Sequence, residues 1–206
     1  MKFNKTYFDK LYPKNETIDG DYNSRDHGDY LKTLFHLMGI HISSVYDFGF
    51  GKGTLLRDVS KKLEATHIRG CDISPYAYES LKKKKWSKNF KLEISEIYNL
   101  KIPKKPYHLG LCNSVLQYIP DDKLKKSIDV LSKSCKYVYF HVPTQEDYKI
   151  LKKDLNFTDS YAIQRKNHVY EKFLKDKFTF VSWGLLESKK FSNHKNSAFT
   201  DSLYRF

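Results

Sequence analysis

Residues 45–59 read VYDFGFGKGTLLRDV, and this stretch decides the fold. Three glycines, Gly49, Gly51 and Gly53, stand at every second position directly after a run of β-branched and aromatic residues. A helix-like pattern over Thr54–Leu63 follows at once. Glycine adopts positive φ readily and has no Cβ, so that the backbone of such a turn can approach a ligand closely. The stretch therefore predicts a ligand-binding turn between a strand and a helix.

Short β-rich runs alternate with helical runs along the chain up to residue 143. We expect strands at 43–48, 67–72, 90–94, 107–113 and 137–142, and helices at 54–63, 75–85 and 121–134. This alternation is typical of βαβ units, in which a mostly parallel sheet is covered by helices on both faces.

The pattern changes after Pro143. Residues 144–168 are polar and mixed, and we expect a helix and an irregular segment there, followed by a helix at 167–177. The runs Phe178–Leu186 and Phe199–Phe206 predict two strands of an antiparallel hairpin. The predicted fold is an α/β, doubly wound, mostly parallel seven-stranded sheet that ends in this hairpin.

We expect one domain over residues 1–206. It divides into an N-terminal lid or helix segment (1–42), a cofactor-binding core (43–143), and a variable acceptor segment with the closing hairpin (144–206). The length of 206 residues and the 40% hydrophobic content suffice for a sizeable core.

Composition narrows the cellular setting and the partners. No run approaches the roughly 18 apolar residues of a membrane span, and the N-terminus has no apolar signal region. Three widely spaced cysteines argue against a disulfide framework or a zinc site, which favours the cytoplasm. The net charge of +13 permits nucleic-acid binding, but the lysines are spread along the chain, as on an ordinary solvated surface.

The glycine spacing distinguishes between cofactors. A dinucleotide-binding loop needs glycine at position 54, which is Thr54, and the phosphate-loop pattern G-x-x-x-x-G-K-[ST] is absent. Asp47 precedes the first glycine at the end of the strand. A carboxylate there would repel a pyrophosphate, whereas it suits a ligand that has an ammonium group.

The run D-F-G-F-G-K-G resembles the first motif of the class I S-adenosylmethionine (SAM)-dependent methyltransferases, (D/E)-x-G-x-G-x-G, and the resemblance continues over residues 43–143. It implies SAM as cofactor and S-adenosylhomocysteine (SAH) as product. Asp72 matches the acid that binds both ribose hydroxyls, and a carboxylate can accept two charge-assisted hydrogen bonds from them. The resemblance implies cofactor contacts from Asp47, Gly49, Gly51, Gly53, Asp72, Ile73, Glu96, Ile97 and Asn113, the last with Ser114 beside the methionine part.

The sequence departs from the family pattern at three places. Glu96 stands where Asp is more frequent, and His108 stands where the fourth motif usually has Asp. The N-P-P-Y variant of amino-directed nucleobase methyltransferases is missing, since Asn113 is followed by Ser-Val-Leu.

The catalytic residues are not identified by the sequence. His141, at the end of the fifth predicted strand, is a candidate general base or a packed histidine, and Tyr118 lines the acceptor pocket or packs in the core. The N-terminal stretch with Tyr22, Arg25 and Tyr30 is either a lid, in which Arg25 pairs with the cofactor carboxylate, or a plain helix start.

Three functions remain open at this point. The first is methyl transfer to an oxygen or nitrogen of a small molecule. The second is methyl transfer to RNA or protein, which the net charge favours. The third is a non-catalytic scaffold or binding module, which the intact Asp47, Gly49, Gly51 and Asp72 disfavour. No cluster of metal ligands stands out, and the sequence does not indicate an oligomeric state.

Overall fold

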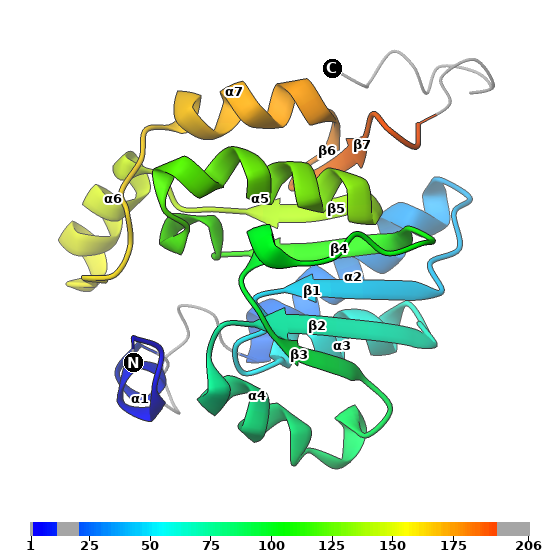
Figure 1. The fold of residues 1–206 in the computed structure, drawn as a ribbon, viewed down its shortest axis with the longest axis horizontal. Helices are drawn as coiled ribbons and strands as arrows, with labels where there is room; N and C mark the ends of the chain where they lie inside the picture. Colours follow the sequence, from blue (N-terminus) through cyan, green and yellow to red (C-terminus); the bar gives the residue numbers. More distant parts are fainter. Residues whose placement is uncertain (1, 12–20, 193–206) are drawn as a thin grey trace. The chain divides into compact units, whose positions relative to one another are not determined.

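The computed structural model describes residues 2–11 and 21–192 (Figure 1). The chain divides into two compact units, residues 1–96 and residues 97–206. The expectation of a single domain stays a prediction. The elements of the first unit are α1 (Lys5–Leu11), α2 (Asp21–Leu37), β1 (Ser44–Phe48), α3 (Thr54–Lys62), β2 (His67–Asp72), α4 (Pro75–Lys82), the short 3₁₀ helix η1 (Lys85–Ser87) and β3 (Lys91–Ile94).

The second unit contains the remaining four strands. Its elements are the 3₁₀ helix η2 (Ile97–Asn99), β4 (Tyr107–Asn113), the 3₁₀ helix η3 (Leu116–Tyr118), α5 (Asp121–Ser134), β5 (Cys135–His141), α6 (Gln145–Leu155), α7 (Asn167–Lys177), β6 (Phe178–Ser182) and β7 (Leu185–Ser188). The seven strands form one sheet in the order β3-β2-β1-β4-β5-β7-β6. This order and the antiparallel β7 confirm the predicted fold class.

In the first unit, β1 pairs in parallel with β2, and β2 pairs in parallel with β3. Strand β1 is buried from Val45 to Phe48, as expected for a strand that is covered on both faces. Helix α2 packs along α3, where Gly28 lets the two helices approach. A Cβ at Gly28 would lie 3.4 Å from the backbone of Asp58.

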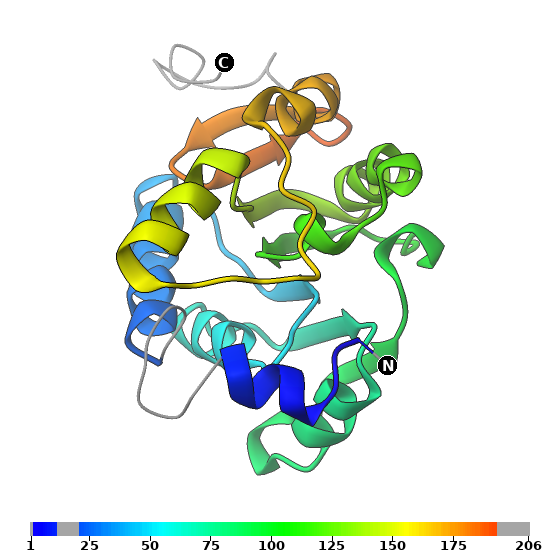
Figure 2. The same ribbon diagram turned by 90° about the vertical axis from the view of Figure 1, so that its left-hand side faces the viewer.

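In the second unit, β4 pairs in parallel with β5, and β5 pairs antiparallel with β7. Helix α5 covers these strands, and α7 lies beside it (Figure 1). Strands β4 and β5 contribute Leu109, Leu111, Val138 and Tyr139 to the core, all of them fully buried. Helix α6 lies beyond the ends at which β4 and β5 stop (Figures 1 and 2).

One predicted strand is wrong. Residues Phe178–Leu186 do not form a single strand, because the chain reverses at Trp183 and Gly184 and returns as β7. Gly184 has a φ of 66°, a conformation that glycine adopts without strain. The hydrophobic run continues through the turn, so hydrophobicity alone did not reveal the reversal. The other predicted strand, Phe199–Phe206, lies outside the described residues.

One helix boundary also differs from the prediction, and one open alternative gains support. Helix α4 ends at Lys82, and the expected last turn is replaced by η1. The polar stretch before Leu31 belongs to α2, which begins at Asp21. Its polar residues therefore form the first turns of a helix.

Candidate functional site

The loop between β1 and α3 depends on its glycines. Gly49, Gly51 and Gly53 have φ values of 97°, 51° and 74°, all in the region that L side chains rarely adopt. The Gly49 N–H donates to the Cys71 carbonyl at 2.7 Å, which ties the loop to β2. The three glycines therefore form a tight turn at the carboxyl ends of β1 and β2, as the sequence predicted.

Position 53 also has no room for a side chain. A Cβ at this position would lie 2.6 Å from Cδ1 of Leu81 on α4. Gly53 is the N-cap of α3, and it has no side chain with which to cap the helix. The start of α3 is thus held close to α4 while its N-terminus, with its partial positive charge, faces the loop.

Asp72 joins the ends of β1 and β2. Its Oδ2 accepts the Gly51 N–H at 2.8 Å, and its Oδ1 accepts the Ser74 N–H at 2.8 Å. Burial raises the pKa of this carboxyl, and the hydrogen bonds from the amides of Ser74, Gly51 and Ile73 act against that shift. A carboxylate has about four acceptor sites, so Asp72 keeps acceptor capacity for a ligand beside these amides.

Asp47 lies beside Asp72 in the buried part of the same edge. Burial raises its pKa well above the ordinary value of 3.8, and the negative charge of Asp72 raises it further. Two carboxyl groups so placed favour a cation or a hydrogen-bond donor as their neighbour.

Two exposed isoleucines flank Asp72. Ile73 is 46% exposed and Ile94, its counterpart at the end of β3, is 49% exposed. Asp72 and Ile94 are paired across β2 and β3. The sequence analysis included Ile73 but missed Ile94, although both are apolar residues at strand ends. Glu96, two residues after β3, is half-buried.

Helix α1, within the segment 1–42 that was expected to be a lid or a helix, lies over the glycine loop. The Phe8 ring is buried, lies 5.7 Å from the Tyr76 ring, and is the nearest group to a Cβ built at Gly51 (3.7 Å). The Ser74 hydroxyl donates to the Phe3 carbonyl. Phe3 lies four residues before Tyr7 and five before Phe8 in the sequence, and this spacing is the pattern that indicates a helix with an aromatic face against the rest of the fold.

Arg25 lies on α2 and is exposed. The pKa of Asp58 on α3 is lowered: burial acts to raise it, but the hydrogen bonds from Arg57 and from the Ser24 hydroxyl (2.8 Å) and, as smaller contributions, the charges of Arg57 and Arg25 outweigh burial. The structure thus places Arg25 near the α2–α3 contact, and its pairing with a cofactor carboxylate stays a prediction.

In the second unit, the ends of β4 and β5 are joined by Ser114. Its N–H donates to the His141 carbonyl at 2.8 Å, and its φ of 55° is uncommon for a residue other than glycine. Asn113, just before it, is half-buried, and Ile97 is buried at the start of η2. Unusual backbone conformations of this kind occur often at functional sites.

His141 packs between two aromatic rings. Its ring centroid lies 4.8 Å from that of Tyr139 and 4.5 Å from that of Trp183. A Cβ at Gly184 would lie 2.4 Å from its Nε2, so this edge of the imidazole faces the hairpin turn. The contact favours the packing interpretation of His141 over the general-base interpretation.

Tyr118 is bonded to a buried carboxylate. Its hydroxyl donates to Oδ2 of Asp159 at 2.6 Å, and Oδ1 of the same residue accepts the Tyr161 N–H at 2.9 Å. Tyr118 therefore holds the segment after α6 against η3. This contact explains the residue without a catalytic role.

Arg165, in the polar segment before α7, is a buried structural residue. It is only 5% exposed, and its guanidinium donates to the carbonyls of Leu116 and Ile119 and to the Asp121 carboxylate. The planar guanidinium with several donors suits this role. No local sequence pattern distinguishes such an arginine from a solvated one.

Among residues 2–11 and 21–192, no group of three or more His, Cys, Asp or Glu side chains is placed to hold a metal ion. In the same part of the chain, no helix is long and apolar enough to cross a bilayer.

Part of the chain matches a known protein domain. Residues 45–137 match the family model described as a methyltransferase domain. No curated protein matches the sequence significantly. The magnesium protoporphyrin IX methyltransferase of Synechocystis PCC 6803, solved with bound SAH, superposes with a TM-score of 0.62 at 20% identity, over 90% of this chain and 95% of that one.

Two further solved structures have the same fold. An S-adenosylmethionine-dependent methyltransferase from Clostridium acetobutylicum gives a TM-score of 0.57 at 21% identity, over 72% of this chain and 60% of that one. The plantazolicin methyltransferase BpumL, in complex with a triazolic desmethylPZN analog and SAH, gives 0.64 at 15% identity, over 83% and 66%. At these identities the structures show the fold alone.

The sheet order, the glycine loop with Asp72 and the matched domain together define a methyltransferase of the Rossmann-like type. Residues 45–137 form a methyltransferase domain, and the fold is that of SAM-dependent methyltransferases. The matched domain confirms the predicted enzyme class and is consistent with SAM as the cofactor.

Proposed function

We propose that this protein transfers the methyl group of SAM to an oxygen or nitrogen of a small-molecule acceptor. The observation that supports it most is the bond between the Gly51 amide and the Asp72 carboxylate, which forms one binding surface from two strand ends. When bound, SAM supplies a methyl group on a sulfonium, which an acceptor displaces in line. The chain has to bind SAM and the acceptor, orient them in line, and exclude water.

The residues of the first unit suit the parts of SAM. Asp72 would accept the two ribose hydroxyls, and the exposed Ile73 and Ile94 would contact the flat adenine. Asp47 would face the ammonium group, which removes the cost of its burial. The glycine loop, with no Cβ at three positions, admits the methionine chain against the backbone.

The roles of the remaining predicted residues rest on the family resemblance. It assigns Glu96 and Ile97 to the adenine and Asn113 to the methionine part, with Arg25 as a candidate partner of the carboxylate. Neither His141 nor Tyr118 is needed as a base if the acceptor arrives deprotonated. Both have structural contacts that account for them.

The small-molecule acceptor is supported by the neighbours whose names state a substrate. One of them is named for magnesium protoporphyrin IX and the other for plantazolicin, and neither name mentions RNA. A cytoplasmic location is part of this proposal. It is supported by the cysteines Cys71, Cys112 and Cys135, which are all buried and form no disulfide.

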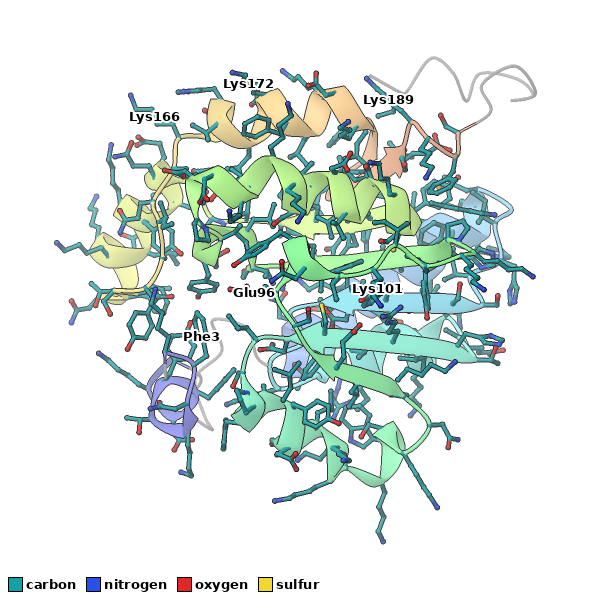
Figure 3. All side chains as sticks on the ribbon, in the orientation of Figure 1. Phe3, Glu96, Lys101, Lys166, Lys172 and Lys189 are labelled. Atoms are coloured by element: carbon teal, nitrogen blue, oxygen red, sulfur yellow. The ribbon has the colours of Figure 1, made fainter. Side chains whose placement is uncertain are left out.

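RNA is the second candidate acceptor, because of the net charge of +13. In the first unit, Lys82 to Lys85 and Lys88 are all exposed around η1. Lysines are not confined to this run, however. Lys166 and Lys172, for example, project from the outer surface of the second unit (Figure 3).

The cofactor is tested by titration of the full chain with SAM and SAH, followed by calorimetry and by thermal unfolding. Ligand at about 100 times Kd stabilises a fold by ~2.7 kcal/mol, which for this size raises the midpoint by roughly 5–10 °C. A chain that binds neither ligand would refute the proposal. The protein is then incubated with radiolabelled SAM and either a small-molecule extract or total RNA. Label that enters small molecules supports the proposal, whereas label that enters RNA and is released by ribonuclease supports the second candidate.

A further inference from the structure

We infer that Trp183, supported by His141, is a stacking platform for the acceptor and that the acceptor has a flat aromatic ring. This inference rests on the proposed function, since it names the class of molecule that receives the methyl group. Its basis is the carboxyl end of β5 and the hairpin turn beside it.

Trp183 is unusually exposed for a tryptophan in a tight turn. The side chain is 58% exposed, although large apolar side chains are usually covered by the fold. The turn itself is well held, because the Phe140 N–H donates to the Gly184 carbonyl at 2.7 Å. A well-held turn that exposes more than half of an indole is suited to bind a flat ring.

The indole is also supported from behind. The centroids of Trp183 and His141 lie 4.5 Å apart with an angle of 54° between their planes, and His141 in turn rests on Tyr139 at 4.8 Å. Gly184 permits this packing, since a Cβ there would lie 2.4 Å from Nε2 of His141. One side of the indole is therefore covered by protein and fixed, which lowers the entropy cost of stacking on the indole.

The position of the platform suits an acceptor site. In the antiparallel pairing of β5 with β7, Tyr139 lies opposite Leu185, so the turn lies at the carboxyl end of β5. Ligands of open α/β sheets bind beyond the carboxyl ends of the strands. The Ser114–His141 bond places the end of β4 next to the same edge.

Other apolar side chains are exposed near this edge of the second unit. Tyr161 and Ile163, on the segment after α6, are 38% and 37% exposed. The Ile163 N–H donates to the Gln117 carbonyl at 2.8 Å, which holds this segment against η3, three residues after β4. The second unit thus exposes apolar side chains both at the hairpin turn and beside η3, which favours an apolar, planar acceptor over a sugar or an aliphatic amine.

The protein has only two tryptophans, Trp86 and Trp183, so its indole N–H signals in a ¹⁵N–¹H correlation spectrum report on both sites separately. Trp86 lies in the first unit beside Arg57 and Phe90. The variant Trp86→Phe assigns the two signals. The probes are 2-naphthol and 2-naphthoate, with decahydro-2-naphthol as the saturated control of the same skeleton, each added to the full chain with SAH present.

We expect a saturable shift of the Trp183 signal with at least one flat probe, little change with the saturated control, and no change at Trp86. Stacking lowers the Kd by a factor of roughly 2 to 12 beyond what the burial of apolar area contributes. Trp183→Leu should therefore raise the Kd of the flat probe about tenfold, whereas Trp183→Phe should stay within about threefold of wild type.

Equal shifts from the flat and saturated probes, or no saturable shift at Trp183, would overturn the inference. So would equal Kd values for Trp183→Leu and Trp183→Phe. SAH binding is measured in the same samples and should be unchanged in both Trp183 variants. Failure of the wild-type chain to bind SAH would refute the proposed function instead, so the two failures are distinguishable.

Discussion

The Asp72 carboxylate accepts the backbone N–H of Gly51 at 2.8 Å, so the second strand holds the loop that follows the first. The same side chain accepts the Ser74 amide at the start of α4. A residue that the family resemblance assigns to the cofactor therefore also organises the loop around it. Changes at Asp72 should affect both roles, and a control is needed to separate them.

Asp72→Asn should raise the Kd for SAH at least about thirtyfold, because hydrogen bonds to a charged group contribute roughly 1.5–3 kcal/mol each. An amide also has one acceptor oxygen, so an NH₂ group would face either the Gly51 or the Ser74 amide. Calorimetric titration measures the effect. The control is Asp58→Asn, a buried aspartate on α3, which should lower stability and leave the Kd within threefold. An unchanged Kd in Asp72→Asn would contradict the assignment.

Asp47→Asn should raise the thermal midpoint of the ligand-free protein at pH 8 by roughly 3–8 °C, since it removes a buried charge. Burial and Asp72 raise the pKa of Asp47 in the folded state. The folded protein therefore holds this proton more tightly than the unfolded chain, and stability is lost as pH rises from the ordinary value of 3.8 towards the folded pKa. The advantage of Asn should accordingly shrink as the pH falls towards 4.

Thermal unfolding of both proteins between pH 4 and pH 8 checks this prediction. A midpoint difference that is constant with pH would argue against a raised pKa at Asp47. The same variant should bind SAM about tenfold more weakly, because the ammonium group would lose its carboxylate partner.

Gly53→Ala should destabilise the protein by about 2–4 kcal/mol, from left-handed strain and from the close approach to Leu81. Gly39→Ala is the matched control. Gly39 has a similar φ of 65°, but nothing lies within 4 Å of a Cβ built there. It should cost only about 1 kcal/mol. Urea unfolding of the two variants isolates the steric part, and equal losses would mean that α4 yields at Leu81.

Arg165→Met should lower stability by about 2–4 kcal/mol, because the carbonyls of Leu116 and Ile119 would lose their buried donor. The control is Lys175→Met on α7, which breaks an exposed ion pair with Glu171 and should stay within about 0.5 kcal/mol. Chemical unfolding measures both. Similar small effects would show that water replaces the guanidinium at these carbonyls.

Much of the site could be read from local patterns. The three glycines, the acid that ends β2 and the alternation of strands and helices each have a short-range physical cause, and the observed β2, β4, α5 and α7 agree with the predicted ranges. The hairpin was harder to locate, because the apolar run continues through Trp183 and the reversal depends on one glycine. The structural roles of Arg165 and Tyr118 could not be predicted either, since Leu116 and Asp159, to which they donate hydrogen bonds, lie 49 and 41 residues away along the chain.

The sequence by itself determined the fold class, the position of the glycine loop and the enzyme class, because backbone freedom, strand-end charge and periodicity are local properties. Only the tertiary structure decided which side chains meet: Asp72 with Gly51, Phe8 over the loop, Arg165 under η3, and Trp183 on His141. Those contacts depend on sheet register and on the approach of helices, in which an ångström separates a contact from a clash. The proposed acceptor site, at the carboxyl end of β5 and the hairpin turn beside it, therefore depends on packing rather than on any one stretch of residues.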